Sequence, residues 1–372
     1  MHILRVANFV SPTSGGIKTA LRAWGEHYRE LGHEASLIIP GPGPEISQEA
    51  QGTVYRVPAT PVPGTGYSLM FERRALSRLM DAVAPDALEV SDRSTTRWMG
   101  RWARRRGVGS VMISHEHMTG ILVRRTPIPE GAAVRTADLI NRRSAHDYDA
   151  IVCPSRFAAE EFHRNGIDAR VVPLGVDLDT FRPSRDLATY RPPGPGEPLR
   201  LVHCGRLSPE KRPALSVETV RELGRRGHDV EMTVFGHGPM REELIERARD
   251  LPVVFHAYIT DRAELASRMG TADVAVAPGP LETFGLAALE VLACGVPAVC
   301  PDEGALQEVV GDAGVVAPST PAAFADGVET LLARPGAAPR AREQAERFNW
   351  RASAQAMLDV HAEVAGRRPR PA

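Results

Sequence analysis

Two glutamates in one segment carry the strongest chemical signal in the sequence. Glu282 and Glu290 lie eight residues apart in PGPLETFGLAALEVLACGVP, residues 278–297. The pattern predicts a helix over 286–294, stopped by a glycine and a proline, with Glu290 inside it among apolar neighbours. A buried carboxylate is costly unless a partner hydrogen-bonds it. A core helix with one internally satisfied glutamate is the alternative, and it stays open at this point.

The turn between the two glutamates is suited to an anion. Phe284 and Gly285 lie there, where a helix N-terminus exposes free N–H groups. Two carboxylates that bracket an anion-binding turn suit a ligand with hydroxyls at both ends and phosphates in the middle. A sugar nucleotide has this layout.

This stretch resembles the glutamate–seven–glutamate signature of retaining glycosyltransferases of family 4, which have the GT-B fold. The resemblance assigns Glu282 to the hydroxyls of the donor sugar and Glu290 to the ribose, with the intervening backbone facing the diphosphate. The donor-binding positions expected in this stretch are Glu282, Thr283, Phe284, Gly285, Leu286 and Glu290.

Two basic residues follow a predicted strand in the segment CGRLSPEKRP. Arg206 and Lys211 fall at the start of a predicted helical turn, where basic residues oppose the helix dipole. An anion held between them would reverse that penalty. The resemblance assigns both to the donor diphosphate, and a solvated basic turn is the alternative.

Three further turns supply weaker candidates for contact with the donor. Gly236 in FGHGP lets backbone approach a ligand, although the third glycine of a dinucleotide fingerprint is missing. Tyr258 and Ile259 follow another predicted strand and could flank the base. Gly15 and Gly16 follow the first strand, and the resemblance places their N–H groups near the phosphate and the acceptor. For this pair a simple tight turn is the alternative.

The segment ISHEHMTG supplies two histidines after a predicted strand. His115 and His117 are two residues apart and lack a convincing further ligand set for a metal. The resemblance favours His115 as the active-site histidine near the donor sugar, with the other histidine structural. Asp177 and Asp179 look like a metal-binding DxD motif, but we interpret them as structural. No metal is expected to be required, because fixed cations take its place.

An arginine-rich stretch in the first half suggests a lipid surface. Asp92 and Arg93, together with the PGPxETFG string, resemble actinobacterial mannosyltransferases that act on phosphatidylinositol lipids. A cationic surface with tryptophans one helical turn apart suits anionic headgroups, and the alternative is a solvated helix face with both tryptophans partly in the core. The expected membrane contacts are Arg97, Trp98, Arg101, Trp102, Arg104 and Arg105.

Composition limits the class of protein. The 372 residues suit two domains, and 43% apolar with 24% charged residues is ordinary for a globular chain. The net charge of −1 argues against a general nucleic-acid binder. No stretch reaches membrane-spanning length, and the first residues read as a strand rather than a signal peptide. The four cysteines lack metal-ligand spacing and are interpreted as buried thiols, so we expect a cytoplasmic protein. Action on a lipid would place it at the inner face of the plasma membrane.

Strands and helices alternate along both halves, which predicts an α/β protein with two doubly wound Rossmann-like domains facing across a cleft. The expected divisions are an acceptor-side domain over 1–182, a proline-rich linker over 183–198 and a nucleotide-sugar domain over 199–350. In GT-B proteins a last helix such as 351–372 packs back on the first domain. The expected strands are 3–9, 35–39, 110–114, 150–153, 199–204, 230–235, 253–256, 274–277 and 298–300.

The sequence therefore predicts a retaining hexosyltransferase with no covalent nucleophile. The preferred donor is GDP-mannose and the preferred acceptor is a glycolipid such as a phosphatidylinositol mannoside. The residues expected to act in catalysis are His115, Glu282, Arg206 and Lys211. The alternatives are a UDP-sugar donor with a small soluble acceptor, a nucleotide-sugar epimerase, or a sugar-nucleotide-binding protein without catalysis.

Overall fold

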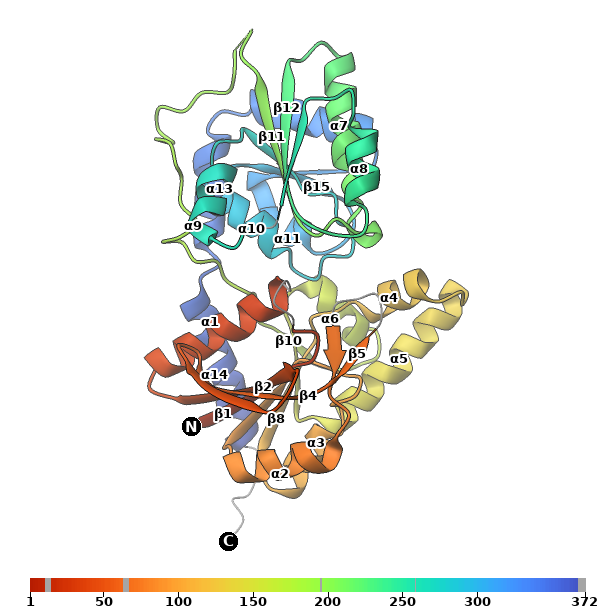
Figure 1. Cartoon of the computed structure of the whole chain (residues 1–372), viewed down its shortest axis with the longest axis vertical. Coiled ribbons are helices and arrows are strands. Elements are labelled where there is room, and N and C mark those ends of the chain that lie inside the picture. Colours follow the sequence, from red (N-terminus) through yellow and green to blue (C-terminus); the bar gives the residue numbers. More distant parts are fainter. Residues whose placement is uncertain (11–14, 63–66, 195, 258, 367–372) are drawn as a thin grey trace. The chain divides into compact units, whose positions relative to one another are not determined.

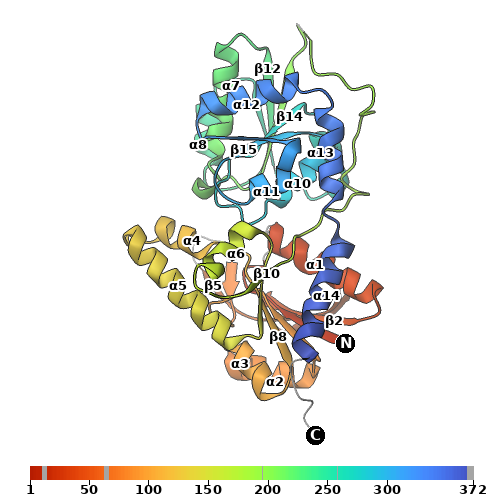
Figure 2. The ribbon, with the colours of Figure 1, turned by 180° about the vertical axis from the view of Figure 1, so that it is seen from behind.

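Parallel strands covered by helices form two units in the computed structural model of the chain (Figures 1 and 2). Unit 1 comprises Met1–Gly175 and Trp350–Ala372, and unit 2 comprises Val176–Asn349. The structure describes residues 1–10, 15–62, 67–194, 196–257 and 259–366.

The sheet of unit 1 has the order β10-β9-β8-β7-β1-β2-β4-β3, in which only the β3–β4 pair is antiparallel. Its inner strands are buried on both faces because helices cover both sides, as expected for a parallel sheet. The strands are β1 (His2–Val6), β2 (Glu34–Gly41), β3 (Glu45–Glu49), β4 (Gly52–Pro58), β7 (Ala87–Val90), β8 (Gly109–Ile113), β9 (Ala150–Cys153) and β10 (Ala169–Val171), with β5 (Thr60–Val62) and β6 (Tyr67–Leu69) in a separate hairpin.

Seven helices of unit 1 lie within the described residues. They are α1 (Gly16–Glu30), α2 (Arg73–Val83), α3 (Met99–Arg105), α4 (Met118–Arg125), α5 (Glu130–Asp147), α6 (Arg156–His163) and α14 (Trp350–Gly366). The last of these packs against α1 and β8 (Figure 2). Ser353 of α14 accepts a 2.9 Å hydrogen bond from the Trp24 indole, and His361 lies 2.7 Å from Glu89. The end of the chain therefore contributes to the core of unit 1.

Unit 2 contains a fully parallel sheet of order β13-β12-β11-β14-β15-β16. Its strands are β11 (Leu199–Cys204), β12 (Val230–Phe235), β13 (Val253–His256), β14 (Val274–Val276), β15 (Ala298–Pro301) and β16 (Val315–Ala317). Its helices are α7 (Pro213–Arg225), α8 (Arg241–Arg247), α9 (Arg262–Met269), α10 (Leu286–Ala293), α11 (Leu306–Val310), α12 (Pro321–Ala333) and α13 (Ala337–Glu346), with short 3₁₀ turns at η1 (Pro209–Lys211) and η2 (Gly311–Ala313).

In each unit the strand order reverses beside the first strand. In unit 1, β1 lies between β7 and β2, and in unit 2, β11 lies between β12 and β14. Ligands of open α/β sheets bind at the carboxyl ends of the strands at such a reversal. The prediction of two doubly wound Rossmann-like units is confirmed, and each unit has one edge where a site is expected.

The proline-rich segment 183–198 was expected as a linker, but two of its described residues bind a carboxylate of unit 2. The Tyr190 hydroxyl donates a 2.9 Å hydrogen bond to Asp273, and the Arg185 guanidinium lies 3.3 Å from the same carboxylate. These contacts satisfy the buried Asp273 carboxylate, and the chain divides into its two units earlier, after Gly175.

All four cysteines are free thiols, and three of them are buried. Burial raises the pKa of Cys153, Cys294 and Cys300 to about 12, so these thiols are poor nucleophiles and poor metal ligands at neutral pH. Within the described ranges, no helix combines the length and the apolar character that crossing a bilayer requires.

Candidate active site

An ion pair joins two loops at the strand-order reversal of unit 2. Lys211 Nζ lies 2.6 Å from Glu282 Oε1, and the two side chains are 25% and 28% exposed. Lys211 ends the turn after β11, and Glu282 follows β14. These strands are paired in parallel, so their carboxyl ends, and the loops that leave them, are adjacent. The structure thus brings together two of the predicted catalytic residues.

Helix α10 starts beside this pair with an open N-terminus. Gly285 adopts φ +98°, and a Cβ there would lie 2.2 Å from the Leu306 side chain, so the position requires glycine. No described side chain caps the helix, which leaves its first N–H groups available to an anion. The Phe284 ring is buried against Phe348, with centroids 5.7 Å apart, so only its backbone can face a ligand. Thr283 and Leu286 are half-buried beside it.

The remaining donor candidates of unit 2 lie on neighbouring loops. Arg206 is exposed on the loop after β11. A Cβ at Gly236 would lie 2.0 Å from the Gly205 carbonyl oxygen, so close packing of the β11 and β12 loops already requires glycine there. Ile259 is half-buried, and Tyr258 lies outside the described residues.

Glu290 forms an internal ion pair that the sequence did not reveal. Its Oε1 accepts a 2.6 Å hydrogen bond from Arg262 Nη2, and the residue is only 8% exposed. Burial raises the pKa of Glu290, and the Arg262 charge opposes that shift. Arg262 also lies over the Phe181 ring, 4.7 Å from its centroid. The alternative of an internally satisfied glutamate thus gains direct support, and the ribose assignment stays a prediction.

His203 is a buried group that the sequence analysis did not single out. It lies near the end of β11, and its Nδ1 lies 2.9 Å from Ser216 Oγ and 3.2 Å from the Val276 carbonyl oxygen. Its Nε2 has no hydrogen-bond partner within the described part of the chain. Burial lowers the pKa of His203 to about 4, so the ring is neutral at pH 7. A histidine in the apolar second half of a strand was the available signal.

In unit 1, His115 follows β8 at the carboxyl edge of the sheet. Its Nε2 lies 3.2 Å from Ser91 Oγ, on the loop after the neighbouring strand β7. Burial lowers the pKa of His115 to about 4, with a smaller opposing effect from Glu89. The imidazole is therefore neutral at pH 7 and is suited to hydrogen bonding rather than to charge neutralisation.

A buried polar network lies near His115. The Trp24 ring centroid is 6.2 Å from that of His115, and the Trp24 indole donates to Ser353 of α14. The Glu89 carboxylate accepts a 2.6 Å hydrogen bond from the Tyr28 hydroxyl and lies 2.7 Å from His361. Because these residues are far apart in the sequence, no local pattern indicated that they meet.

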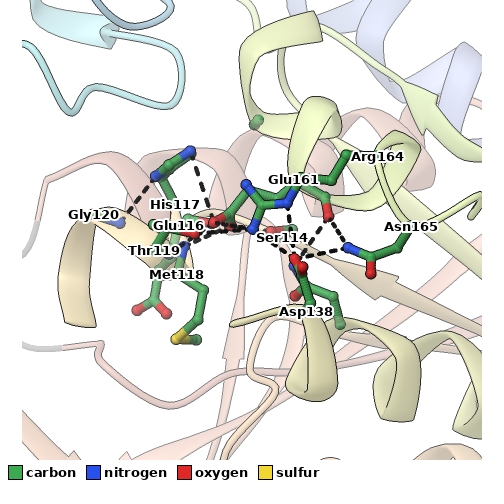
Figure 3. A network of polar contacts seen from close by, with 12 residues as sticks. Ser114, Glu116, His117, Met118, Thr119, Gly120, Asp138, Glu161, Arg164 and Asn165 are labelled. Atoms are coloured by element: carbon green, nitrogen blue, oxygen red, sulfur yellow. Dashed lines mark hydrogen bonds and ion pairs between the residues drawn. The ribbon is translucent and has the colours of Figure 1, made fainter. Parts of the chain in front are cut away.

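His117 has a structural role (Figure 3). Its Nδ1 accepts a 3.1 Å hydrogen bond from the Gly120 N–H, which caps α4, and its ring stacks on Phe157. The buried Glu161 carboxylate accepts 2.7 Å bonds from the first two N–H groups of α4 and lies 3.7 Å from His117. Of the two histidines, His117 is therefore the one that caps a helix.

Asp92 and Arg93 are both buried and internally bound. The Arg93 guanidinium donates to Asn141 and Ser114, each at 2.6 Å. The Asp92 carboxylate accepts a 2.9 Å bond from the Asn8 amide. These side chains join the loops at the carboxyl edge of the sheet and do not project from it.

The expected membrane contact at α3 is wrong for its tryptophans. Trp98 and Trp102 are 9% and 1% exposed and belong to the hydrophobic core. Trp102 lies on the face of α3 that packs on the sheet, and Trp98 lies just before the helix, so neither buried ring can meet lipid. The arginines Arg101, Arg104 and Arg105 are exposed, whereas Arg97 is half-buried.

Gly15 and Gly16 are exposed at the start of α1, and no described side chain caps this helix. The Asp177 carboxylate accepts bonds from the N–H groups of Asp179 at 3.1 Å and Thr180 at 3.0 Å, which closes a turn. Among the described residues, no group of three or more His, Cys, Asp or Glu side chains is arranged to hold a metal.

Comparison with known families matches both halves of the chain. Residues 191–348 match the family described as glycosyl transferases group 1, and residues 15–176 match the glycosyl transferase 4-like domain. Over 364 residues the chain is 44% identical to a Mycobacterium tuberculosis protein named GDP-mannose-dependent alpha-(1-6)-phosphatidylinositol dimannoside mannosyltransferase, covering 96% of this chain and 95% of the relative. A Mycolicibacterium smegmatis protein, the corresponding monomannoside mannosyltransferase, is 30% identical over 362 residues, 90% of each chain.

Solved structures share the fold of both units. Sucrose-phosphate synthase from Thermosynechococcus elongatus gives a TM-score of 0.80 at 20% identity, covering 98% of this chain and 99% of that one. The Anabaena protein HepE, solved with UDP and glucose, gives 0.73 at 15% identity, covering 97% and 99%. At such identities the likeness shows the fold alone.

Proposed function

The chain belongs to the glycosyltransferases of group 1, has the GT-B fold, and its N-terminal half matches the glycosyl transferase 4-like domain. We propose that it transfers mannose from GDP-mannose to a phosphatidylinositol mannoside. The observation that carries this choice of donor and acceptor is the 44% identity to a relative named for that reaction, over 96% of this chain. The loops of unit 2 supply the chemistry.

Lys211, Arg206 and the N-terminus of α10 would hold the donor diphosphate. In the proposed reaction the bond from the sugar C1 to the diphosphate breaks, and a bond from C1 to the acceptor oxygen forms on the same face. The acceptor proton passes to the departing phosphate oxygen. Positive charge placed beforehand at that oxygen lowers the barrier, and preorganised electrostatics of this kind usually gives the largest catalytic term.

Glu282 would orient the sugar hydroxyls, and its ion pair with Lys211 would hold it beside the diphosphate. His115 would donate or accept a hydrogen bond at the sugar as a neutral imidazole. The fixed cations take the place that a metal holds in other glycosyltransferases, so the proposed reaction requires no metal. Gly15 and Gly16 would offer backbone N–H groups to a phosphate of the donor or acceptor.

Product analysis tests the proposal. Purified protein is incubated with GDP-mannose and detergent-dispersed phosphatidylinositol dimannoside, and mass spectrometry should detect one added hexose. Parallel reactions contain UDP-glucose or UDP-N-acetylglucosamine. Transfer from a UDP-sugar but not from GDP-mannose would refute the proposed donor. Conversion of the donor without any acceptor would indicate an epimerase. Donor binding without turnover would indicate a sugar-nucleotide sensor. The reaction should also continue in EDTA.

A further inference from the structure

One side of helix α5 carries arginines and an exposed leucine. Arg135, Leu139, Arg142 and Arg143 are spaced by four, three and one residues, so they share one side of the helix, and all four are exposed. We call these four residues the arginine face. It spans about 12 Å along the helix axis, from the rise of 1.5 Å per residue.

Helix α5 has three acidic residues: Glu130 is exposed in its first turn, outside the arginine face, and the other two are paired with arginines. The Asp138 carboxylate lies 2.7 Å from Arg164 and accepts a bond from Asn165, so it points toward α6 (Figure 3). Asp147 is buried between Arg97 and Arg101, at 3.3 and 3.5 Å. Between residues 131 and 146 the sequence has no other acid. The chain as a whole has 46 acidic and 45 basic residues, so this local excess of positive charge is not a general property of its surface.

The positive surface continues onto the neighbouring helices. Arg104 of α3 donates a 2.6 Å hydrogen bond to the His146 carbonyl oxygen, which places the exposed arginines of α3 at the C-terminal end of α5. Near the other end, α4 packs on α5 and presents Val123, which is 42% exposed. Leu139, within the arginine face, is also 42% exposed. The surface therefore combines positive charge with exposed apolar groups.

We propose that the arginine face docks the protein on an anionic phospholipid bilayer. The proposal rests on the proposed function, because a phosphatidylinositol mannoside acceptor is presented at a membrane surface. Guanidinium groups pair with phosphate oxygens in a bidentate manner, and apolar side chains among them enter the headgroup region. A single-stranded nucleic acid would favour aromatic side chains for stacking, and the arginine face has none.

The chain links this surface to the candidate site. Helix α4 begins at Met118, three residues after His115, and α5 follows directly. Docking through α5 would hold the carboxyl edge of the unit 1 sheet at a fixed distance from the lipid phosphates. The Glu161 contacts at the start of α4 make this connection stiff (Figure 3).

Vesicle sedimentation tests the proposal with a matched pair of variants. Arg135→Gln/Arg143→Gln removes two charges from the arginine face and spares Arg142, which bonds Asn165. Arg225→Gln/Arg249→Gln removes two charges from exposed positions of unit 2, so both variants have the same net charge. The vesicles contain phosphatidylcholine alone or with phosphatidylglycerol, and binding of GDP-mannose and thermal unfolding verify that each variant is intact.

Unaltered protein should bind the anionic vesicles, less at high salt, and should not bind neutral ones. The α5 variant should lose about 30-fold in partition coefficient, since each arginine near an anionic surface contributes about 1 kcal/mol. The unit 2 variant should bind as the unaltered protein does. Equal loss in both variants, equal binding to neutral vesicles, or binding to a DNA fragment but not to vesicles would overturn the proposal.

The docking surface and the proposed reaction can fail separately. Transfer to a detergent-dispersed acceptor needs no vesicle, so the α5 variant should retain it. If the unaltered protein does not bind anionic vesicles but transfers mannose normally in detergent, only the docking proposal is refuted. If the unaltered protein binds anionic vesicles but transfers no mannose, only the proposed reaction is refuted. A Leu139→Ser variant should weaken the part of the vesicle binding that resists salt.

Discussion

Substitution of Lys211 by alanine separates a role in catalysis from a role in structure. Lys211 Nζ contacts Glu282 at 2.6 Å, but both side chains retain about a quarter of their exposure, so water can replace the lysine at the carboxylate. Such partly exposed ion pairs contribute up to about 1 kcal/mol to stability. Loss of one preorganised donor to a leaving oxyanion lowers kcat by roughly 10²–10³, which is about 2.7–4 kcal/mol in the barrier.

We therefore expect Lys211→Ala to lower kcat by ~10²–10³ and the free energy of unfolding by less than about 1 kcal/mol. Steady-state transfer from GDP-mannose gives kcat, and urea unfolding gives stability. Lys211→Arg should retain most of the activity because it keeps the charge. Arg200→Ala is the control, because it removes one charge from the opposite end of β11, where Arg200 pairs with Glu231, and should leave kcat unchanged.

A double-mutant cycle with Glu282→Gln then decides how the lysine acts. If Lys211 contacts the diphosphate itself, adding Lys211→Ala to Glu282→Gln should lower kcat by at least a further factor of about ten. If Lys211 only positions Glu282, the double variant should be no slower than Glu282→Gln alone. That second result, or full activity in Lys211→Ala, would refute the assignment to the leaving group.

Three further outcomes are expected. Glu290→Gln should weaken GDP-mannose binding about 10–100-fold in calorimetry if its carboxylate binds the ribose, since a hydrogen bond to a charged group contributes about 1.5–3 kcal/mol; unchanged affinity would leave only the ion pair with Arg262. His203 has its folded-state pKa lowered from 6.5 to about 4, so only the unfolded chain binds its proton between those values, and stability should fall as pH drops from 6.5 to 4. The contribution is about 3 kcal/mol, and His203→Phe should flatten this limb of the pH-dependent unfolding curve; an unchanged limb would contradict it. Ser353→Ala leaves the buried Trp24 indole without its acceptor and should lower the free energy of unfolding by about 1–3 kcal/mol in urea titration, whereas no change would mean that water reaches the indole.

The regular elements of unit 2 were readable from local pattern. Strands β11, β12 and β13 have the predicted bounds, because short apolar runs between turn residues leave little freedom in their assignment. Helix α10 begins at the predicted residue, where Gly285 provides the left-handed conformation that starts it. Edge strands such as β3 were not predicted, because its residues are mostly exposed and lack an apolar run.

The sequence did not predict which face of a helix is buried and which is exposed. The arginines and tryptophans of residues 97–105 suggested a lipid contact, yet Trp98 and Trp102 lie in the core. A helix that has both apolar and cationic residues fits either a protein core or a membrane, and only the neighbouring sheet decides between them. The sequence did not indicate the arginine face of α5, because Asp138 and Asp147 dilute its charge along the chain and are turned inward only by tertiary contacts.

The sequence by itself determined the alternation of strands and helices, the glycine that starts α10 and the residue types of the proposed donor site, because these depend on neighbours within a few positions. Tertiary structure alone decided that Lys211 meets Glu282, that Glu290 meets Arg262, and that Trp24 lies between His115 and α14. These contacts follow from the order in which strands pair and from how helices pack on the sheet. The order of strand pairing depends on the free energy of the whole unit, so it cannot be predicted from the spacing of residues within one segment.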